Sequence, residues 1–267
     1  MAKKALCVGV NDYPVAGMDL KGCVNDATQW ARLLTEHYDF VRRDVTVVVD
    51  ADATHDRIIA EVKALLAGAS AGDVLVFTNS SHGTYLADAG AEEADRYDEA
   101  ICPWDCKEQL LSDDELRELF ASLGRGVRLA VISDSCHSGS VTRAAPAGLS
   151  PDDRRVRFLH PSNLGRPAIE GVRAAVPRRR DTYPESQMKE LLLSGCPADQ
   201  YSFDAKIDDS YHGAMSYFAR KVIEEAEYRI TWSQLARKVA YELRGAQYDQ
   251  EPQLEGRAAA KRRQIFT

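Results

Sequence analysis

The chain has 267 residues, and 34 lysines and arginines against 41 aspartates and glutamates give it a net charge of −7. Hydrophobic residues make up 45% of the sequence and charged residues 28%, which is ordinary for a globular protein and excludes a chain that is disordered throughout. We therefore predict one large domain, and the acidic balance argues against a general nucleic-acid binder, which usually has a basic surplus.

The sequence lacks the signals of a membrane or secreted protein. No stretch approaches the ~20 apolar residues that span a bilayer, and the apolar run at residues 5–10 is too short for a signal peptide. Cys102 and Cys106 are the only close pair of cysteines, and four residues apart with no second pair they are a weak zinc signal. The six cysteines follow no disulfide spacing, so we expect reduced thiols, a cytoplasmic location and no membrane partner.

Short β-branched runs alternate with segments of helical periodicity in the first half of the chain. The predicted strands are residues 5–10, 44–49, 73–78 and 127–133. They are too apolar to be half exposed, which favours a parallel sheet covered on both faces. Helices are predicted over residues 24–34 and 58–66 and from Ser112, where Glu115 has the spacing of a capping box. This alternation is typical of a doubly wound α/β fold.

The composition changes between Arg143 and Arg180. This segment has nine arginines, no lysine and three acids, a net charge of +6, and it holds five of the ten prolines. Because it has no convincing periodicity, we predict a long, exposed connection. Regular structure resumes with a predicted strand at residues 190–194 and helices at 214–227 and 231–244.

A histidine and a cysteine follow the third and fourth predicted strands. The third strand leads into His82 and Gly83, and the fourth leads into Cys136. Adjacent parallel strands end at one edge of a sheet, where the histidine could activate the cysteine and the nearby backbone amides could bind an oxyanion. The pattern alone supports a nucleophilic site and a buried cysteine beside a capping histidine about equally. His137 competes as the base, but neighbours in a turn usually point apart; His212 is expected in a loop.

At this point the sequence resembles the metacaspases and bacterial caspase-like peptidases of the caspase–gingipain clan, peptidase family C14. The matching segments are residues 5–11, 20–27, 81–83, 97–101 with Pro103 and Asp105, 134–139, 192–196 with Asp199 and Gln200, and 213–214. The chain lacks the Gln-Ala-Cys-x-Gly motif of true caspases, which favours the metacaspase branch. The resemblance implies a caspase-like α/β fold with a mostly parallel central sheet flanked by helices on both faces. Residues 1–267 would form one domain, with a large-subunit-like part (1–140), an Arg/Pro-rich linker (141–188) and a small-subunit-like part (189–267).

The resemblance implies a cysteine endopeptidase. Cys136 and His82 would form the catalytic dyad, and the backbone amides of Gly83 and Cys136 would bind the oxyanion. The family's specificity pocket corresponds to Asp26, Ser80 and Asp134. Two carboxylates there would recognise a guanidinium or ammonium group, so we expect protein or peptide substrates with Arg or Lys at P1. The competing interpretations are a helix-face carboxylate for Asp26 and a turn-forming residue for Asp134.

Calcium is the one metal that the resemblance raises. Asp98, Asp113 and Asp114 match ligand positions of calcium-dependent metacaspases and offer the hard oxygen atoms that calcium binds. Arg143 replaces a fourth aspartate, and Asp113 and Asp114 also suit the N-terminus of a helix. We therefore expect no required cofactor.

An Arg-specific peptidase with an Arg-rich linker carries candidate substrates in its own chain. We expect a zymogen that is activated by cleavage in the linker, in cis or by an upstream protease. The candidate sites are Arg143, Arg154, Arg155, Arg157, Arg166, Arg173, Arg178, Arg179 and Arg180. The alternatives are a linker that binds nucleic acid or another anionic partner, and a catalytically silent scaffold. We expect a monomer.

Overall fold

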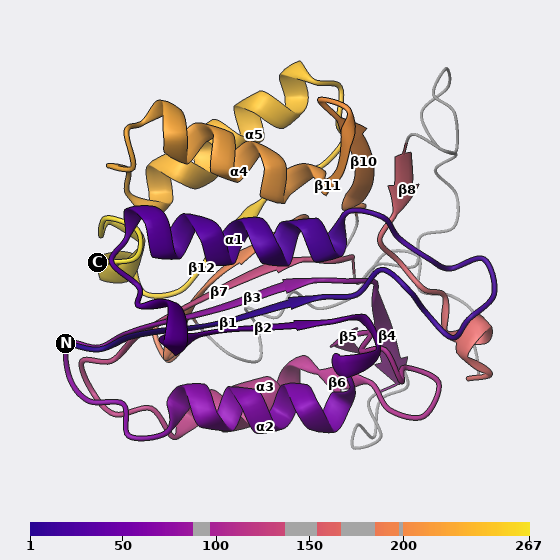
Figure 1. Cartoon of the computed structure of the whole chain (residues 1–267), viewed down its shortest axis with the longest axis horizontal. Helices are drawn as coiled ribbons and strands as arrows, with labels where there is room; N and C mark the ends of the chain where they lie inside the picture. The colour runs from indigo at the N-terminus through magenta and orange to yellow at the C-terminus, as the bar shows by residue number, and fades with distance from the viewer. Residues whose placement is uncertain (88–96, 137–153, 167–184, 198–199) are drawn as a thin grey trace.

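The computed structural model describes residues 1–87, 97–136, 154–166, 185–197 and 200–267 (Figure 1). At its centre is a six-stranded sheet in the order β12-β9-β7-β3-β1-β2. The parallel strands are β1 (Lys3–Gly9), β2 (Val45–Val49), β3 (Val74–Ser80), β7 (Arg128–Asp134) and β9 (Glu190–Ser194). The short strand β12 (Gln253–Glu255) pairs antiparallel with β9 at one edge. The predicted α/β class with a mostly parallel sheet is confirmed.

Helices cover both faces of this sheet (Figure 1). The helices α1 (Cys23–His37), α4 (Ala214–Glu225) and α5 (Trp232–Gly245) lie on one face. The helices α2 (His55–Leu66) and α3 (Asp113–Ala121) lie on the other, and the short α6 (Ala258–Lys261) lies near the C-terminus. The described residues also form the short 3-10 helices η1 (Arg42–Asp44), η2 (Asp50–Asp52) and η3 (Pro161–Leu164). The four helices predicted from periodicity and the one predicted from the capping box at Ser112 are present, with ends that differ by a few residues.

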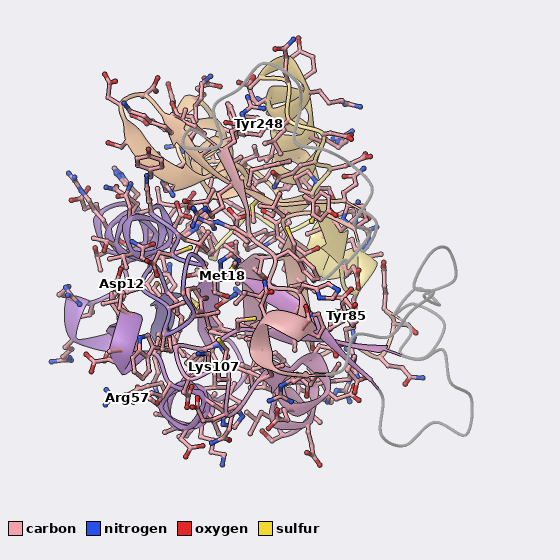
Figure 2. All side chains as sticks on the ribbon, turned by 90° about the vertical axis from the view of Figure 1, so that its right-hand side faces the viewer. Asp12, Met18, Arg57, Tyr85, Lys107 and Tyr248 are labelled. Carbon is pink, nitrogen blue, oxygen red and sulfur yellow. The ribbon has the colours of Figure 1, made fainter. Side chains whose placement is uncertain are left out.

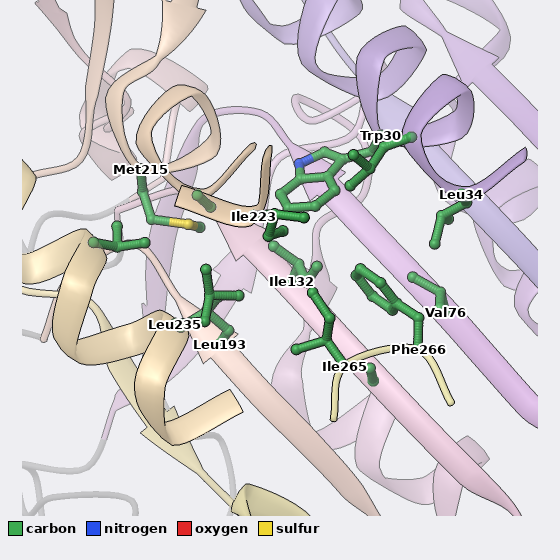
Figure 3. Packing of buried hydrophobic residues seen from close by; sticks show 14 of the residues in the cluster. Trp30, Leu34, Val76, Ile132, Leu193, Met215, Ile223, Leu235, Ile265 and Phe266 are labelled. Atoms are coloured by element: carbon green, nitrogen blue, oxygen red, sulfur yellow. The ribbon is translucent and has the colours of Figure 1, made fainter. Parts of the chain in front are cut away.

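The hydrophobic core is divided by the sheet into two clusters because parallel strands bury both faces. Val76 of β3 belongs to the cluster under α1, α4 and α5, whereas its neighbour Phe77 belongs to the cluster above α2 and α3. Trp30 and Phe266 pack edge to face in the first cluster, with ring centres 6.3 Å apart (Figure 3). This packing fixes the strands and therefore the positions of the residues that follow them.

Local signals set several helix starts. The capping box predicted at Ser112 and Glu115 is present, with both reciprocal hydrogen bonds formed. A second capping box, between Thr231 and Gln234, begins α5, and the Thr54 side chain caps α2. Both termini lie at the amino ends of the parallel strands, away from the carboxyl ends where the site was predicted (Figure 1).

Two small antiparallel sheets at the carboxyl ends of the strands were not predicted. One has the order β4-β5-β6 and consists of β4 (Gly83–Ala87), β5 (Tyr97–Ile101) and β6 (Leu111–Ser112). The other has the order β11-β10-β8 and consists of β11 (Ser210–Gly213), β10 (Phe203–Ile207) and β8 (Arg154–Val156). The tight turn between β10 and β11 is formed by Asp208 and Asp209, both with positive φ.

The prediction of an exposed connection is wrong for residues 154–166. Strand β8 pairs with β10, and the side chains of Arg157 and Leu159 are completely buried. The physical reason is that the carboxylates that surround Arg157 come from distant parts of the chain, so local composition gives no sign of them. The remaining linker candidates Arg143, Arg173 and Arg178–Arg180 lie outside the described residues, as does His137. Within the described ranges, no helix is long and apolar enough to cross a membrane.

Candidate active site

The two predicted catalytic residues follow neighbouring strands. Strands β3 and β7 are paired in register, with Ser80 opposite Asp134. His82 and Cys136 each lie two residues beyond that pair, so the sheet brings them to the same edge. The backbone amides of Gly83 and Cys136 both donate to one carbonyl oxygen, that of Arg157, at 3.0 and 3.1 Å. Two convergent amides of this kind can stabilise a developing oxyanion.

His82 is fully buried and held in a defined orientation. Its Nε2 lies 2.7 Å from the carbonyl oxygen of Met18, which can only accept a hydrogen bond, so Nε2 carries the proton and Nδ1 has the free lone pair. The amide of His82 donates to the hydroxyl of Tyr13 at 3.0 Å. Burial lowers the pKa of His82 to about 4. The backbone of Met18 and that of Arg157 partly oppose this shift, and the charges of Arg157 and Arg155 reinforce it. The imidazole is therefore neutral, as a general base must be.

Cys136 is also fully buried, and its thiol contacts Ser202. The Sγ atom lies 3.2 Å from the carbonyl oxygen of Ser202 and accepts a hydrogen bond from the Ser202 amide. The same carbonyl accepts a hydrogen bond from the amide of Arg157 at 2.9 Å. The peptide group on each side of Arg157 is thus held beside the thiol, by Ser202 on one side and by the two convergent amides on the other.

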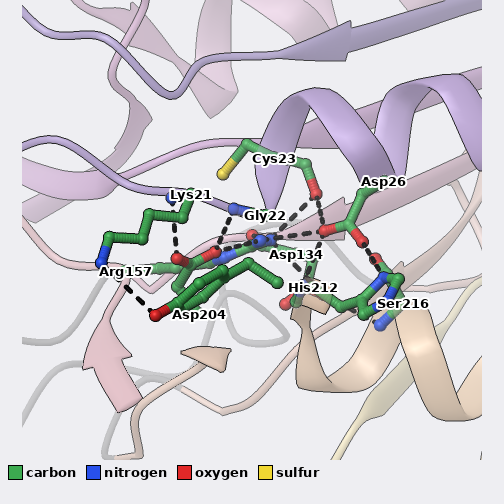
Figure 4. A network of polar contacts seen from close by, with 12 residues as sticks. Lys21, Gly22, Cys23, Asp26, Asp134, Arg157, Asp204, His212 and Ser216 are labelled. Carbon is green, nitrogen blue, oxygen red and sulfur yellow. Dashed lines mark hydrogen bonds and ion pairs between the residues drawn. The ribbon is translucent and has the colours of Figure 1, made fainter. Parts of the chain in front are cut away.

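The guanidinium group of Arg157 lies between the predicted pocket residues Asp26 and Asp134 (Figure 4). It also contacts the third predicted pocket residue, Ser80. Its Nη2 donates to Asp26 Oδ2 at 2.9 Å, and its Nη1 donates to Ser80 Oγ at 2.9 Å. Nη1 also donates to the backbone carbonyl of Asp134 at 3.0 Å and lies 3.6 Å from its carboxylate. The structure therefore brings the three predicted pocket residues together around an arginine of the chain itself.

A third carboxylate, Asp204, completes this pocket and was missed from the sequence. Asp204 Oδ1 accepts a hydrogen bond from Arg157 Nη2 at 3.0 Å, and its carboxylate accepts the amides of Lys21 and Gly22 at 2.9 Å each. Asp204 lies in β10, a strand that the sequence analysis did not recognise. The signal was the pair of short alternating runs on either side of Asp208 and Asp209.

His212 and Arg220 add to the charge balance of the pocket. His212 Nδ1 lies 3.8 Å from Asp26 Oδ1, and Arg220 Nη1 lies 3.4 Å from the same atom. The prediction that His212 is a loop residue is wrong, because it lies in β11 and is mostly buried. The hairpin β10–β11 carries both Asp204 and His212 to the pocket, so one unrecognised element explains both errors.

Burial and ion pairing act in opposite directions on the pocket carboxylates. Burial alone would raise the pKa of Asp26, but Arg157, His212 and Arg220 together outweigh burial and lower this pKa to about 2. Burial outweighs Arg157 at Asp134, whose pKa is raised. Among the described residues, Arg157 and Arg220 are the cations that face Asp26, Asp134 and Asp204, and His212 lies near Asp26. Removal of the Arg157 guanidinium would therefore leave excess buried negative charge, so the charge of the pocket favours a cation at this position.

Gly213, which precedes α4, makes room for the guanidinium. A Cβ atom at this position would collide first with the carboxylate of Asp134, and it would lie 2.5 Å from Arg157 Nη1 and 2.8 Å from its Cζ. Its backbone has φ −67° and ψ 130°, which any residue can adopt, so the need for glycine is one of space alone. The amides of Gly213 and Ser216 donate to Asp26 and Asp134 at 2.8 and 2.9 Å.

The three aspartates predicted as calcium ligands lie together at a separate place. Asp98, Asp113 and Asp114 each offer a carboxylate oxygen, and these oxygens lie within 4.8 Å of one another. Arg117 donates to Asp113 at 2.6 Å and also to Asp114. Oxygen donors of this kind fit a hard cation, but a guanidinium group already neutralises two of the three.

Comparison with known proteins gives a consistent family. The model of the metacaspase, peptidase C14 domain matches residues 3–145. Metacaspase-8 of Arabidopsis thaliana is 38% identical over 148 residues, which are 53% of this chain and 38% of the relative, so the chain spans less than half of that relative's length. Metacaspase-1 of Pyricularia oryzae is 30% identical over 288 residues, covering 94% of this chain and 71% of the relative.

Solved structures share the fold. A protein from Geobacter sulfurreducens superposes with a TM-score of 0.74 at 23% identity and covers 100% of this chain and 99% of its own. Caspase-1 from Spodoptera frugiperda has a TM-score of 0.57 at 9% identity and covers 95% and 86%. At these identities the likeness establishes the caspase-like fold, as the sequence analysis predicted.

The pocket predicts the effect of removing Arg157. In a Cys136→Ala background, which keeps the chain intact, Arg157→Ala should lower the free energy of unfolding by roughly 3–5 kcal/mol because it leaves buried carboxylates unpaired. Benzamidine should raise the melting temperature of this variant in a concentration-dependent way, since its amidinium can replace the guanidinium. Denaturant titration and thermal melts measure both, with Arg155→Ala at an exposed position as control. Equal stability of the Arg157→Ala variant and its parent would contradict the pocket assignment.

The depressed pKa of His82 predicts a pH dependence of stability. Because the pKa falls from 6.5 to about 4 on folding, the unfolded chain binds a proton between these pH values and the folded chain does not. His82 should therefore cost up to about 3 kcal/mol of stability as the pH falls from 7 to 4. Urea titrations of Cys136→Ala with and without His82→Gln, at a series of pH values, isolate the contribution of His82 to the free energy of unfolding. If the free energies of the two proteins change with pH in parallel, the predicted contribution of His82 is refuted.

Proposed function

This chain belongs to the metacaspase family of C14 peptidases, and on that premise we propose that it is a cysteine endopeptidase that cleaves peptide bonds after arginine or lysine. The observation that carries the proposal is the position of Arg157. Its side chain occupies a pocket of three buried carboxylates while its carbonyl oxygen accepts hydrogen bonds from the amides of Gly83 and Cys136. This is the arrangement that acyl transfer requires of a substrate's P1 residue.

Each step can be assigned to a group of this chain. Nδ1 of His82 takes the proton of the Cys136 thiol, and Sγ attacks the carbonyl carbon of the P1 residue. The amides of Gly83 and Cys136 stabilise the oxyanion, and collapse of this intermediate breaks the C–N bond as His82 returns the proton to the leaving amine. Water, deprotonated by His82, then hydrolyses the thioester and releases the new carboxylate. The Met18 carbonyl holds the imidazole in the tautomer that these transfers need.

We further propose that the chain is a zymogen whose own linker is its first substrate. The structure describes four of the nine candidate arginines, namely Arg154, Arg155, Arg157 and Arg166. Of these four, Arg157 is the one with its side chain in the carboxylate pocket and its carbonyl on the two amides. The bond from Arg157 to Phe158 is therefore the proposed cleavage site. Until it is cut, the segment excludes other substrates from the pocket.

The alternatives in which the linker binds nucleic acid or the chain is a silent scaffold have less support. Arg154, Arg155 and Arg157 all donate hydrogen bonds to protein groups, which engages the charges that a phosphate backbone would require. Both members of the dyad are present. We also propose a monomer, since the short edge strand β12 covers the edge of β9.

We propose no calcium requirement, because Arg117 neutralises Asp113 and Asp114. Activity should differ by less than about twofold between chelator and millimolar calcium. A many-fold increase on titration with calcium would overturn this proposal.

Self-cleavage tests the proposed zymogen. On prolonged incubation, the wild-type chain should yield two fragments, one ending at Arg157 and one beginning at Phe158, because that bond lies beside the thiol. Intact mass spectrometry measures the fragments over time. Cys136→Ala should remain whole, and Arg157→Ala should lose this cut. Identical masses for wild type and Cys136→Ala after incubation would contradict self-processing.

A substitution that removes space from the carboxylate pocket tests the proposed specificity for arginine at P1. Gly213→Ala should reduce kcat/KM for a P1-Arg fluorogenic peptide at least about 100-fold, because the added Cβ collides with the Asp134 carboxylate and with the guanidinium beside it. Gly245→Ala is the matched control, since a Cβ there would meet nothing within 4 Å. Assays use enzyme after linker cleavage and include a P1-Asp peptide, which should not be cleaved by any of the three proteins. Full activity of Gly213→Ala, or cleavage of the P1-Asp peptide, would refute the pocket.

A further inference from the structure

The segment before Arg157 lies along the sheet as an extended strand. Strand β8 pairs antiparallel with β10, with Val156 opposite Phe203 and Arg154 opposite Ala205. If Arg157 is the P1 residue, Val156, Arg155 and Arg154 occupy P2, P3 and P4. Addition of a strand to a sheet edge is a common way to bind an extended peptide, in which pockets for individual side chains give specificity. The contacts of each side chain therefore indicate what the site recognises.

Arg154 is held by groups that match a guanidinium. Its guanidinium carbon lies 3.9 Å from the ring centre of Tyr248, within the range of a cation–π interaction. Its Nη1 donates to the carbonyl of Gln247 at 3.0 Å, and its Nη2 donates to the carbonyl of Ala246 at 3.2 Å. These carbonyls follow the C-terminus of α5, where the helix leaves acceptors unpaired and its dipole favours a cation. Arg154 thus meets an aromatic face and two acceptors at once.

The aromatic ring is fixed by the rest of the molecule. Tyr248 is 6% exposed, and its ring packs against Phe203 and Phe218 with centres 5.9 and 6.1 Å apart. Figure 2 looks onto the carboxyl ends of the strands and shows Tyr248 well separated from Met18, the residue that positions His82. The groups that hold Arg154 also differ from those that hold the Arg157 guanidinium, so the Tyr248 site is distinct from the carboxylate pocket.

Arg155 provides a contrast within the same segment. Its side chain is exposed, and its Nη1 donates to the backbone carbonyls of Gly17, at 3.2 Å, and Asp19. Within the described residues, no aromatic ring packs against its guanidinium group in the way that Tyr248 packs against Arg154. A neighbouring arginine of equal charge therefore lacks the combination that holds Arg154.

We infer that Tyr248 and the carbonyls of Ala246 and Gln247 form a second specificity pocket, which binds an arginine at P4. The substrate class is then a polypeptide that carries the pattern Arg-Xaa-Xaa-Arg before the cleaved bond. This inference rests on the proposed function, because it takes Arg157 as P1. Lysine at P4 binds less well, since a compact ammonium cannot stack on the ring and reach both carbonyls in one plane.

The first experiment uses the intact chain. Arg154→Ala should slow Cys136-dependent cleavage after Arg157 about tenfold. Arg166→Ala, at an arginine of the same described segment whose guanidinium donates to the Glu108 carbonyl, should slow it less than about twofold. Time courses of intact mass measure both rates. Equal rates for wild type and Arg154→Ala overturn the second pocket. If the wild type shows no Cys136-dependent cleavage, either of its own chain or of the peptides described below, the proposed function is overturned and the inference with it.

The second experiment uses peptides and self-cleaved enzyme. The substrates are acetyl-Arg-Ala-Val-Arg and acetyl-Ala-Ala-Val-Arg with the same fluorogenic leaving group. The wild type should prefer the first about tenfold in kcat/KM, and Tyr248→Phe, which keeps the ring, should retain the preference. Tyr248→Leu should lose it, and Tyr241→Ala, at an exposed tyrosine of α5, should not.

The readout is the ratio of the kcat/KM values of one enzyme for the two peptides. Partial misfolding of a variant lowers both values equally and leaves their ratio unchanged. Persistence of the preference in Tyr248→Leu, or its absence in the wild type, overturns the second pocket. Cleavage of both peptides at equal rates by the wild type would leave the proposed P1 specificity intact, so the two failures are distinguishable.

Discussion

Three carboxylates and one guanidinium group, all buried, set the constraint on which the site depends. Asp26 comes from α1, Asp134 from the end of β7 and Asp204 from β10, and Arg157 bonds or pairs with each of them. Buried carboxylates without a cation are costly, because burial removes their hydration and they repel one another. The interaction that holds Arg157 in place is therefore the one that, under the proposed function, an arginine of a substrate would reproduce.

The parallel sheet converts this pocket into a reaction site. In-register pairing of β3 and β7 brings His82 and Cys136 to one edge, and the residues beside them supply amides that converge on one carbonyl. The two residues that follow Arg157 are also held by the core. The ring of Phe158 stacks on that of Tyr85 with ring centres 6.0 Å apart, and Leu159 is completely buried. The peptide bond after Arg157 is thus held on both sides by structure that the rest of the core has already fixed.

Two arginines, one in β8 and one directly after it, are held by different chemistry. Buried carboxylates hold Arg157, whereas an aromatic ring and the carbonyls after a helix hold Arg154. Neither contact depends on apolar periodicity, which explains why the segment forms an ordered strand although its sequence is that of a polar, Arg-rich connection. If cleavage releases this strand, both groups of acceptors become available to another peptide of the same pattern.

The sequence by itself determined the elements whose signals are local. The strand at residues 190–194, the capping box at Ser112 and the placement of His82 and Cys136 after adjacent strands all follow from periodicity, spacing and the geometry of parallel sheets. The pocket residues Asp26, Ser80 and Asp134 came from family resemblance. Only the tertiary structure decided that Asp204 joins them, that Tyr248 contacts Arg154 and that Arg157 is buried. Each of these depends on contacts between residues far apart in the chain, and an arginine is exposed or buried according to whether carboxylates surround it, which local composition does not encode.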